Sequence, residues 1–381
     1  MSVALTQAFV RFVRSEQAGG ALLAICTLLA LGLANSPLGE DYAALRHAHL
    51  GPLTVEHWIN DALMAVFFLL VGLELEREIY VGELSQPRKA LLPLVAAIGG
   101  MAVPAGIHAA LNAGSPTASG FGIPMATDIA FALAVLSVLG RRVPPSLKVF
   151  LVAVAVADDL GAVIVIAAAY TTELSLVALA GAGATFGLLV VLNRVFRVMA
   201  LWPYLLGGGV LWFALLEAGV HASIAGVLLA FAIPFTARDP ARPSPSHRLE
   251  EKLHVPVGFV VLPLFALANT AIEVDGGALA AVVDRNGLGI ALGLLVGKPL
   301  GIVLLSWAAV KAGICALPDE LGWRHVIGAG MLGGIGFTMS IFISNLAFAS
   351  DPAHLEASKL AVLCASTLAG VVGLLWLRTR T

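Results

Sequence analysis

The amino-acid sequence predicts an all-α integral membrane protein from three observations: few charged residues, long apolar stretches, and a one-sided distribution of Lys and Arg. Charged residues make up 12% of the 381 residues, and the apolar set AVILMFWYC makes up 59%. Soluble domains average about 25% charged residues. This chain therefore has too few ionised side chains to cover a surface that faces water.

Twelve apolar stretches are candidate transmembrane helices, because a helix that crosses a bilayer needs about 20 mainly apolar residues. The alternating pattern of a membrane β-barrel does not occur in them, which favours helices. The seventh and eighth stretches also read as one long segment. In order, the predicted spans are 18–34, 58–78, 90–112, 117–139, 147–170, 174–193, 202–218, 220–236, 255–272, 287–312, 325–349 and 357–377.

The basic residues predict the orientation of these spans. If the N-terminus is cytoplasmic, all but four of the 22 Lys and Arg residues fall in cytoplasmic segments. The exceptions are Arg46, Arg285 and Lys359 on the opposite side, and Lys298 inside a span. This distribution follows the positive-inside rule and predicts twelve spans with both termini in the cytoplasm.

Net charge and cysteine content argue against several other classes of protein. The formal net charge is −2, without a run of like charges, so we expect no nucleic-acid partner. Cys26, Cys315 and Cys364 are odd in number and far apart, which fits neither a disulfide framework nor a zinc site. We expect no cofactor.

The outer connection 35–57 is one of two longer loops. It contains the turn-like pair Gly51-Pro52, followed by Leu53, Thr54 and Val55. This order predicts a small β-hairpin.

Four ionisable residues fall inside predicted spans, at mid-membrane depth: Asp128, Asp158, Asp159 and Lys298. Each charge there costs at least roughly 2.5–3.5 kcal/mol on insertion scales, so such residues usually mark an ion or proton pathway. The alternative is a structural ion pair of Lys298 with Asp158 or Asp128. Three acids facing one base favour the pathway for the group, whereas for Asp158 and Lys298 alone both interpretations stand.

The chemistry of these side chains suits a small hard cation that competes with protons. Asp158 and Asp159 are adjacent, so on a helix they point about 100° apart. Thr127, beside Asp128, offers another oxygen, and carboxylate and hydroxyl oxygens are ligands for hard cations such as Na+. A carboxyl group that carries protons near neutral pH needs a pKa above its ordinary value of about 3.9, and burial can supply that shift.

Two of the predicted spans contain helix-breaking residues near their centres. Pro124 precedes Asp128 in one span, and Gly334 and Gly336 interrupt another. Glycine-rich membrane helices are often only packing surfaces. However, each of these spans is the middle one of a three-span unit, 90–170 or 287–377, and the two units enter the membrane from opposite sides.

This arrangement predicts inverted three-helix repeats with two discontinuous helices that cross at the midplane. At the crossing, Asp128 would neutralise helix N-termini and Lys298 would neutralise helix C-termini.

Several motifs resemble those of one known family. In chain order they are Asn60-Asp61-Ala62-Leu63-Met64-Ala65-Val66-Phe67-Phe68 with Gly72-Leu73-Glu74, Ala126-Thr127-Asp128-Ile129-Ala130-Phe131-Ala132, Asp158-Asp159-Leu160-Gly161, Gly219-Val220-His221-Ala222, Leu262-Pro263-Leu264-Phe265-Ala266, Gly297-Lys298-Pro299-Leu300-Gly301 and Gly334-Ile335-Gly336-Phe337-Thr338-Met339-Ser340. From about residue 18 to 377 they resemble, in the same order, the NhaA family of Na+/H+ antiporters.

The resemblance implies an electrogenic exchanger that moves Na+ or Li+ out against a larger number of protons in, across a bacterial inner membrane. It assigns cation and proton binding to Asp158 and Asp159, with Asp159 as the direct sodium ligand. It assigns charge compensation at the broken helices to Asp128 and Lys298. Lys298 would also bridge to Asp158 and release it when Na+ binds, and a proton-carrying role for Lys298 is the alternative.

The resemblance also implies an organisation for the single transmembrane unit 1–381. A core that binds the ion would comprise 90–170 and 287–377, and interface or panel helices would comprise 18–78 and 174–272. The core would rock against the panel. A homodimer through the 35–57 loop and the panel helices is a further expectation, although this loop is shorter than the hairpin that pairs two subunits in the best-known members.

The pH-response region of the family maps onto cytoplasmic residues of this sequence. Glu251 stands where the family has a histidine and His247 where it has a lysine, so the activation pH does not follow from the resemblance. A solvated charge cluster is the alternative for each residue, and a structural histidine for His221. The mapped residues are Glu74, Arg77, Glu78, His221, His247, Glu250 and His254.

Two other functions are alternatives for a membrane protein with buried aspartates. An intramembrane aspartyl protease would place two aspartates on neighbouring spans, as Asp128 and Asp159 are, but its Gly-x-Gly-Asp motif is absent. A sodium-coupled solute symporter of related architecture is the stronger alternative. It requires a solute pocket, for which the spans offer few polar residues beyond the named acids and Thr127.

Overall fold

The computed structural model describes residues 16–82, 85–171, 174–236, 243–274 and 276–380. Over these residues the regular structure is helical, apart from one two-stranded hairpin. The chain divides into two compact units. Unit 1 comprises residues 1–42, 83–162 and 269–381, and unit 2 comprises residues 43–82 and 163–268.

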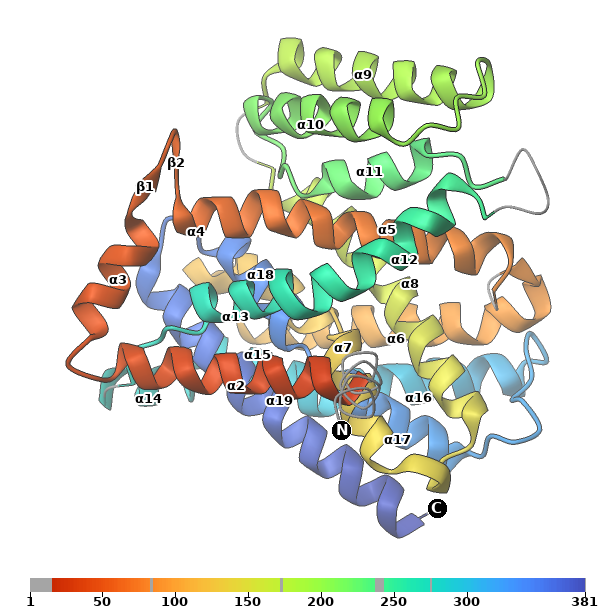
Figure 1. The fold of residues 1–381 in the computed structure, drawn as a ribbon. Coiled ribbons are helices and arrows are strands. Elements are labelled where there is room, and N and C mark those ends of the chain that lie inside the picture. Colours follow the sequence, from red (N-terminus) through yellow and green to blue (C-terminus); the bar gives the residue numbers. More distant parts are fainter. Residues whose placement is uncertain (1–15, 83–84, 172–173, 237–242, 275, 381) are drawn as a thin grey trace, which may run out of the picture. The chain divides into compact units, whose positions relative to one another are not determined.

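Figure 1 labels the helices. Helices α3 (Gly39–His47) and α8 (Pro145–Ala169) have residues in both units, and so does α13 (Leu262–Asn269), whose last residue, Asn269, belongs to unit 1. The elements of unit 1 are α2 (Glu16–Ala34), α6 (Pro87–Leu111), the 3₁₀-helix η3 (Pro116–Met125), α7 (Ile129–Val138), the 3₁₀-helix η4 (Gly140–Arg142), α14 (Gly276–Ala281), α15 (Arg285–Leu292), the π-helical segment η6 (Gly293–Gly297), α16 (Lys298–Lys311), α17 (Trp323–Gly333), α18 (Phe337–Ala347) and α19 (Pro352–Arg380).

Unit 2 contains the hairpin and a group of helices. In Figure 1, α9, α10 and α11 follow one another as layers that end on α5. The elements are β1 (His49–Leu50), β2 (Leu53–Thr54), α4 (Val55–His57), the π-helical η1 (Trp58–Leu63), α5 (Met64–Tyr80), α9 (Leu176–Arg194), α10 (Trp202–Glu217), α11 (Ile224–Ala232), α12 (Pro245–Pro256), the π-helical η5 (Val257–Val261) and α13 (Leu262–Asn269).

Among the described residues, eight helices are long and apolar enough to cross a membrane, and the number rises to ten when two bent helix pairs each count as one span. The remaining two predicted spans fall on α10, which has 16 residues, and α11, which has nine. Both are shorter than the roughly 20 residues that a span needs. The protein therefore has an all-helical membrane fold with eight to ten candidate spans.

The two bent pairs lie where the sequence contains Pro124 and the glycine run. η3 and α7 meet at 45° across residues 126–128, and α17 and α18 meet at 46° across residues 334–336. Gly334 is required by close packing, because a Cβ atom there would collide with the backbone oxygen of Leu294. Each break leaves backbone groups without partners in their own helix, and these groups line the site described below.

The predicted hairpin in the 35–57 loop is confirmed. His49 pairs with Thr54 and Leu50 pairs with Leu53 in an antiparallel register. Gly51 occupies the turn with φ +70°, a conformation that glycine adopts without strain. Val55, which the sequence placed in the hairpin, instead begins α4.

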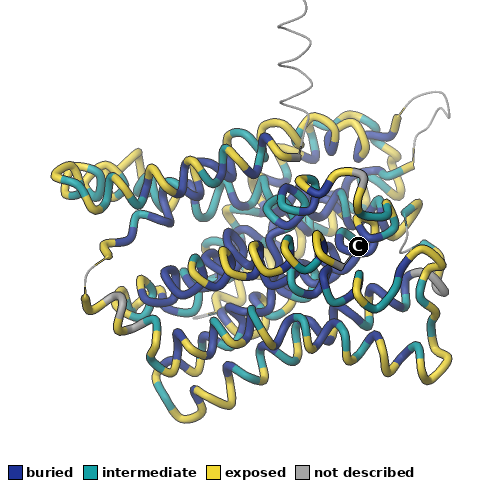
Figure 2. Tube along the Cα trace, turned by 90° about the horizontal axis from the view of Figure 1, so that it is seen from below, coloured by how far each residue is buried: buried dark blue, intermediate teal, exposed yellow. Residues whose placement is uncertain are grey.

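Apolar side chains form the core of each unit, and many helices carry buried and exposed residues on different faces (Figure 2). In unit 2, Leu73, Tyr204 and Ile233 belong to one buried cluster and Leu211 and Ala225 to another. In unit 1, α6 packs along α16 at very close range. A Cβ atom at Gly99 would collide with the backbone oxygen of Gly301, and one at Gly301 with that of Gly99.

We expect Gly301→Val to destabilise the protein by about 1–3 kcal/mol, because the added side chain must push α6 away from α16. Gly106→Val is the control, since Gly106 lies in α6, the helix that faces Gly301, and a Cβ there meets open space. Thermal unfolding in detergent measures both variants. Equal melting temperatures for the two would contradict the close approach.

Candidate ion-binding site

The centre of the site is a buried ion pair in unit 1. The ammonium Nζ of Lys298 lies 2.7 Å from Oδ2 of Asp158, and both side chains are fully buried. The Thr127 hydroxyl also lies 2.7 Å from this Oδ2. Two polar groups thus converge on one carboxylate oxygen, while the other oxygen, Oδ1 of Asp158, has no hydrogen-bond partner among the described residues.

Lys298 and Thr127 also contact the C-terminal ends of the broken helices. Lys298 Nζ donates to the backbone oxygen of Met125, the last residue of η3. Thr127 Oγ1 lies 3.0 Å from the backbone oxygen of Gly333, the last residue of α17. These carbonyls lack partners within their helices and carry partial negative charge. The Lys298 ammonium therefore stabilises the end of η3, and the single hydroxyl hydrogen of Thr127 is shared between the Gly333 carbonyl at the end of α17 and the Asp158 carboxylate.

Asp128 faces the opposite ends of the same breaks. Its Oδ1 accepts from the backbone N–H of Phe131 at 2.9 Å, which caps α7. Its Oδ2 accepts from the backbone N–H of Thr338 at 3.1 Å and from the Thr338 hydroxyl at 2.5 Å, at the start of α18. One carboxylate therefore faces two helix N-termini, where the partial charge is positive.

The two breaks are also joined directly. The backbone N–H of Asp128 donates to the backbone oxygen of Ile335 at 2.7 Å. The N–H groups of Gly336 and Phe337 both donate to Ser366 Oγ on α19. The hydroxyl of Ser340 donates to the backbone oxygen of Ile123 at 2.6 Å.

Asp159 follows Asp158 on α8 and is 1% exposed. Its side chain interacts electrostatically with Lys298. The structure therefore gathers Thr127, Asp158, Asp159 and Lys298 in one buried region, with Asp128 next to Thr127 at the break. Pro124, Gly334 and Gly336 supply the irregular backbone around it.

Sequence reasoning did not assign roles to three residues of this region. Thr338 and Ser340 follow a glycine run at a helix start, where Ser and Thr commonly cap, so a signal was present. Ser366 lies within α19, a continuous apolar helix. Serine there usually bonds its own helix backbone, and nothing in the sequence distinguishes it.

A second group of charged residues lies in unit 2, on α5 and α12. Arg77 Nε lies 2.9 Å from Glu250, and Arg77 Nη2 lies 3.3 Å from Glu78. His254 lies 3.5 Å from Glu74 and 3.9 Å from Glu250. This charged cluster therefore joins the C-terminal part of α5 to α12 through ion pairs.

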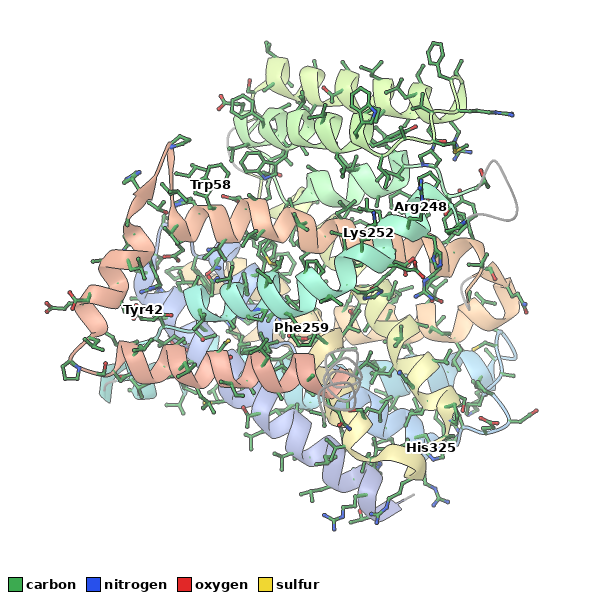
Figure 3. All side chains as sticks on the ribbon, in the orientation of Figure 1. Tyr42, Trp58, Arg248, Lys252, Phe259 and His325 are labelled. Carbon is green, nitrogen blue, oxygen red and sulfur yellow. The ribbon has the colours of Figure 1, made fainter. Side chains whose placement is uncertain are left out.

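The remaining members of the predicted pH-response set divide between two places. His247 lies 3.6 Å from Glu250 and 3.5 Å from Glu251, so it joins the cluster. His221 is bound elsewhere in unit 2, where its Nε2 lies 2.9 Å from the backbone oxygen of Tyr170. Two further basic side chains of α12, Arg248 and Lys252, are exposed (Figure 3).

Glu76 is a buried acid that sequence reasoning missed. It is 4% exposed, and its Oε2 accepts from the hydroxyl of Ser246 at 3.0 Å. It lies on α5 between Glu74 and Arg77, where alternating acids suggest a solvated helix end rather than a buried group. Across the described residues, no three His, Cys, Asp or Glu side chains are grouped to hold a metal ion.

A sequence profile of the family described as Na+/H+ antiporter 1 matches residues 10–377. The chain belongs to this family. Members of the Na+/H+ antiporter 1 family are membrane transporters rather than enzymes. The chain is therefore a multi-pass membrane protein of the antiport class, since it belongs to this family and has several apolar helices long enough to cross a membrane.

Individual members of the family cover nearly the whole chain. The protein named Na(+)/H(+) antiporter NhaA from Dechloromonas aromatica is 61% identical over 373 residues, which are 98% of this chain and 96% of that protein. A protein of the same name from Cytophaga hutchinsonii is 54% identical over 374 residues, with 98% and 96% covered. Another, from Mesorhizobium japonicum, is 52% identical over 370 residues, with 96% and 93% covered.

We expect Lys298→Ala to lower the melting temperature in detergent more than Asp159→Asn does. Removal of the ammonium group leaves the Asp158 carboxylate and the Met125 carbonyl buried without their cationic partner. Breaking a buried ion pair from one side costs about 3–5 kcal/mol. Asp159→Asn keeps the size of the side chain and leaves that pair intact. A melting temperature of Lys298→Ala at or above that of Asp159→Asn would contradict a structural bridge.

Proposed function

We propose that this protein exchanges Na+ or Li+ for protons across the bacterial inner membrane. The observation that carries the proposal is the buried Asp158–Lys298 pair beside Asp159, where two broken spans meet. Membership of the Na+/H+ antiporter 1 family supports the same assignment.

In the proposed cycle, Na+ and protons compete for the same carboxylates. Asp159 and Asp158 provide oxygen ligands for Na+, and Thr127 provides a hydroxyl oxygen, a donor set that hard cations prefer. Oδ1 of Asp158 is the oxygen not already hydrogen-bonded in the described structure. Binding of Na+ displaces the Lys298 ammonium from Oδ2, and protonation of the carboxylates in the other orientation expels the cation.

Asp128 has a different proposed role from the two ligands. Its hydrogen bonds to Phe131 and Thr338 occupy both of its oxygens. We assign it to charge compensation at the helix N-termini. Exchange of one monovalent cation for more than one proton makes the cycle electrogenic, and two carboxylates at the site supply the necessary proton sites.

The architecture proposed for this cycle has twelve spans with cytoplasmic termini. The triplets 90–170 and 287–377 form an ion-binding core of inverted repeats whose discontinuous helices cross at the midplane. The helices of 18–78 and 174–272 form the panel against which the core moves. The bends at residues 126–128 and 334–336 support this proposal. The distribution of Lys and Arg residues predicts that the two triplets enter the membrane from opposite sides. A homodimer through the 35–57 loop and the panel helices is part of the same proposal.

We assign pH regulation to the charged cluster on α5 and α12. Its histidines, His247 and His254, each lie within 4 Å of carboxylates. Deprotonation of His254 as the pH rises removes a positive charge from beside Glu74 and Glu250. Loss of that charge weakens the attachment of α12 to α5. A change in pH therefore alters how firmly these two helices are held together.

The experiment that tests the function uses everted membrane vesicles with a pH-sensitive dye. The vesicles are energised, and Na+, Li+ or K+ is added between about pH 6.5 and 8.5, around the range where buried carboxyl groups titrate. Proton efflux after Na+ or Li+ supports exchange. Na+ uptake coupled to a solute, without proton movement, would instead support a sodium-coupled symporter.

We expect Asp159→Asn to abolish proton efflux on addition of Na+ or Li+, because the amide has neither the charge to bind the cation nor a proton to exchange. Asp319→Asn is the control, since Asp319 is exposed in the connection before α17. A melting temperature within a few degrees of the unmodified protein shows that Asp159→Asn folds. Normal exchange by this folded variant would overturn the site assignment.

We expect His254→Gln to shift half-maximal activity to lower pH by roughly half a unit, because the variant resembles deprotonated histidine at every pH. His47→Gln is the control, since His47 is exposed and pairs with Glu56 beside the hairpin, away from the cluster. The vesicle assay over a series of pH values measures both variants. An unchanged profile for His254→Gln would remove His254 from the proposed sensor.

A further inference from the structure

A chain of buried polar side chains in unit 1 has no part in the cycle proposed above. His108 Nε2 lies 3.1 Å from Asn286 Oδ1, and Asn286 Nδ2 donates to Ser358 Oγ at 2.8 Å. Ser358 Oγ in turn donates to the backbone oxygen of His354 at 2.7 Å. The three side chains His108, Asn286 and Ser358 are at most 1% exposed. The chain therefore connects α6, α15 and α19.

The directions of these hydrogen bonds determine that Nε2 of the His108 ring carries a hydrogen. The Ser358 hydroxyl uses its hydrogen for the His354 carbonyl, so it accepts from the Asn286 amide nitrogen. Asn286 Oδ1 then faces His108 and must accept, which places a hydrogen on Nε2. Asn112 adds a second connection between the same helices, from its Nδ2 to the backbone oxygens of His108 and Arg285.

The imidazole of His108 occupies a narrow slot between two glycines. A Cβ atom at Gly120 would lie 3.0 Å from Cε1 of the ring, and one at Gly289 would lie 2.8 Å from Cδ2. Gly120 belongs to η3 and Gly289 to α15. A side chain at either position would displace the ring, so both elements are shaped to hold it in one place.

The far end of the chain is anchored at the start of α19. His354 Nδ1 lies 2.5 Å from Oδ2 of Asp351, the residue before α19, and the backbone N–H of His354 donates to its Oδ1. The hydrogen bond from the His354 side chain lowers the pKa of Asp351 below its ordinary value. Asp351 therefore remains a charged cap of α19 over a wide pH range.

Asn286 lies on the same continuous helix as Lys298. Residues 285–311 form one run in which α15 passes through the π-helical segment η6 into α16, and Lys298 is the first residue after η6. A π-helical turn contains an extra residue, which rotates all later side chains by about 100° relative to an uninterrupted α-helix. The direction in which the Lys298 side chain points therefore depends on η6 remaining π-helical.

Contacts on both sides hold η6 in place. A Cβ at Gly293 would lie 2.6 Å from Cβ of Pro124, and one at Gly297 would lie 2.9 Å from Cα of Pro104. After η6, Gly301 packs on Gly99. Before η6, Asn286 and its hydrogen bond to His108 fix the rotation of α15. If α15 were free to rotate, η6 would relax towards α-helix and Lys298 would turn away from Asp158.

We propose that His108 is a positioning residue for Lys298: through Asn286 it fixes the rotation of α15, so that η6 directs the Lys298 ammonium to Asp158 and Met125. The inference rests on the proposed function, in which Lys298 belongs to the ion site. His108 itself does not contact the ion.

The test compares two substitutions of His108. His108→Leu removes the donor and leaves Asn286 Oδ1 buried without its partner, whereas His108→Gln keeps an N–H donor and cannot titrate. We expect His108→Leu to require at least threefold more Na+ for half-maximal exchange at neutral pH and to shift the pH profile in the alkaline direction. Without an ammonium group beside it, Asp158 holds its proton more strongly. We expect His108→Gln to remain within twofold of the unmodified protein.

Asn193→Leu is the control, in unit 2. Asn193 Nδ2 donates to the backbone oxygen of Ala232 at 3.0 Å, which connects α9 to the last residue of α11 and does not involve α15. We expect this variant to melt at a lower temperature without a change in Na+ dependence or pH profile. If His108→Leu behaves in the same way, the chain is only structural and the proposal is wrong.

A double substitution separates this proposal from the proposed function. The two substituted residues have different hydrogen-bond partners, Asn286 for His108 and Asp158 with Met125 for Lys298. Substitutions at sites without shared partners usually have additive effects. We expect the melting-temperature losses of His108→Leu and Lys298→Ala to sum to more than the loss of the double variant. Full additivity would overturn the positioning role. This measurement needs no transport, so it remains decisive if the unmodified protein shows no exchange and the proposed function fails.

Discussion

The contact between Lys298 and Asp158 is the interaction on which the rest of unit 1 depends. A buried ammonium group is tolerated only when its charge is fully compensated, and here a carboxylate and a helix-end carbonyl share it. The same need explains Asp128, which stabilises two helix N-termini of the same breaks. Two interrupted spans can therefore persist in an apolar environment because their exposed backbone ends are paired with buried charges of the opposite sign.

The membrane class, the hairpin and the positions of the breaks could all be predicted from the sequence. Each rests on a local signal: apolar length, a Gly-Pro turn, or Pro124 and Gly334 within an apolar stretch. Buried Asp and Lys side chains are equally conspicuous, because they are rare at membrane depth. The length of a helix is harder to predict, since α11, with nine residues, is much shorter than the apolar stretch 220–236 that contains it.

Apart from the Asp158–Lys298 ion pair, partners distant in sequence could not be predicted. Ser366, Glu76 and the His108–Asn286 contact depend on which helix faces which, and isolated Ser, Asn or His residues in apolar helices give no indication of it. Nothing in the sequence indicates the π-helical segment η6 either. The extra residue of a π-helical turn is recognised only from the backbone hydrogen bonds of the folded helix.

The hydrogen bond from the Asp128 amide to the Ile335 carbonyl has a mechanical consequence. It joins the two interrupted spans at their weakest points, where neither backbone is supported by its own helix. A displacement of one break therefore pulls on the other, since separating them would leave a buried donor and a buried acceptor unsatisfied. The two bends are therefore mechanically coupled. A displacement that begins on one span is transmitted to the other through this hydrogen bond.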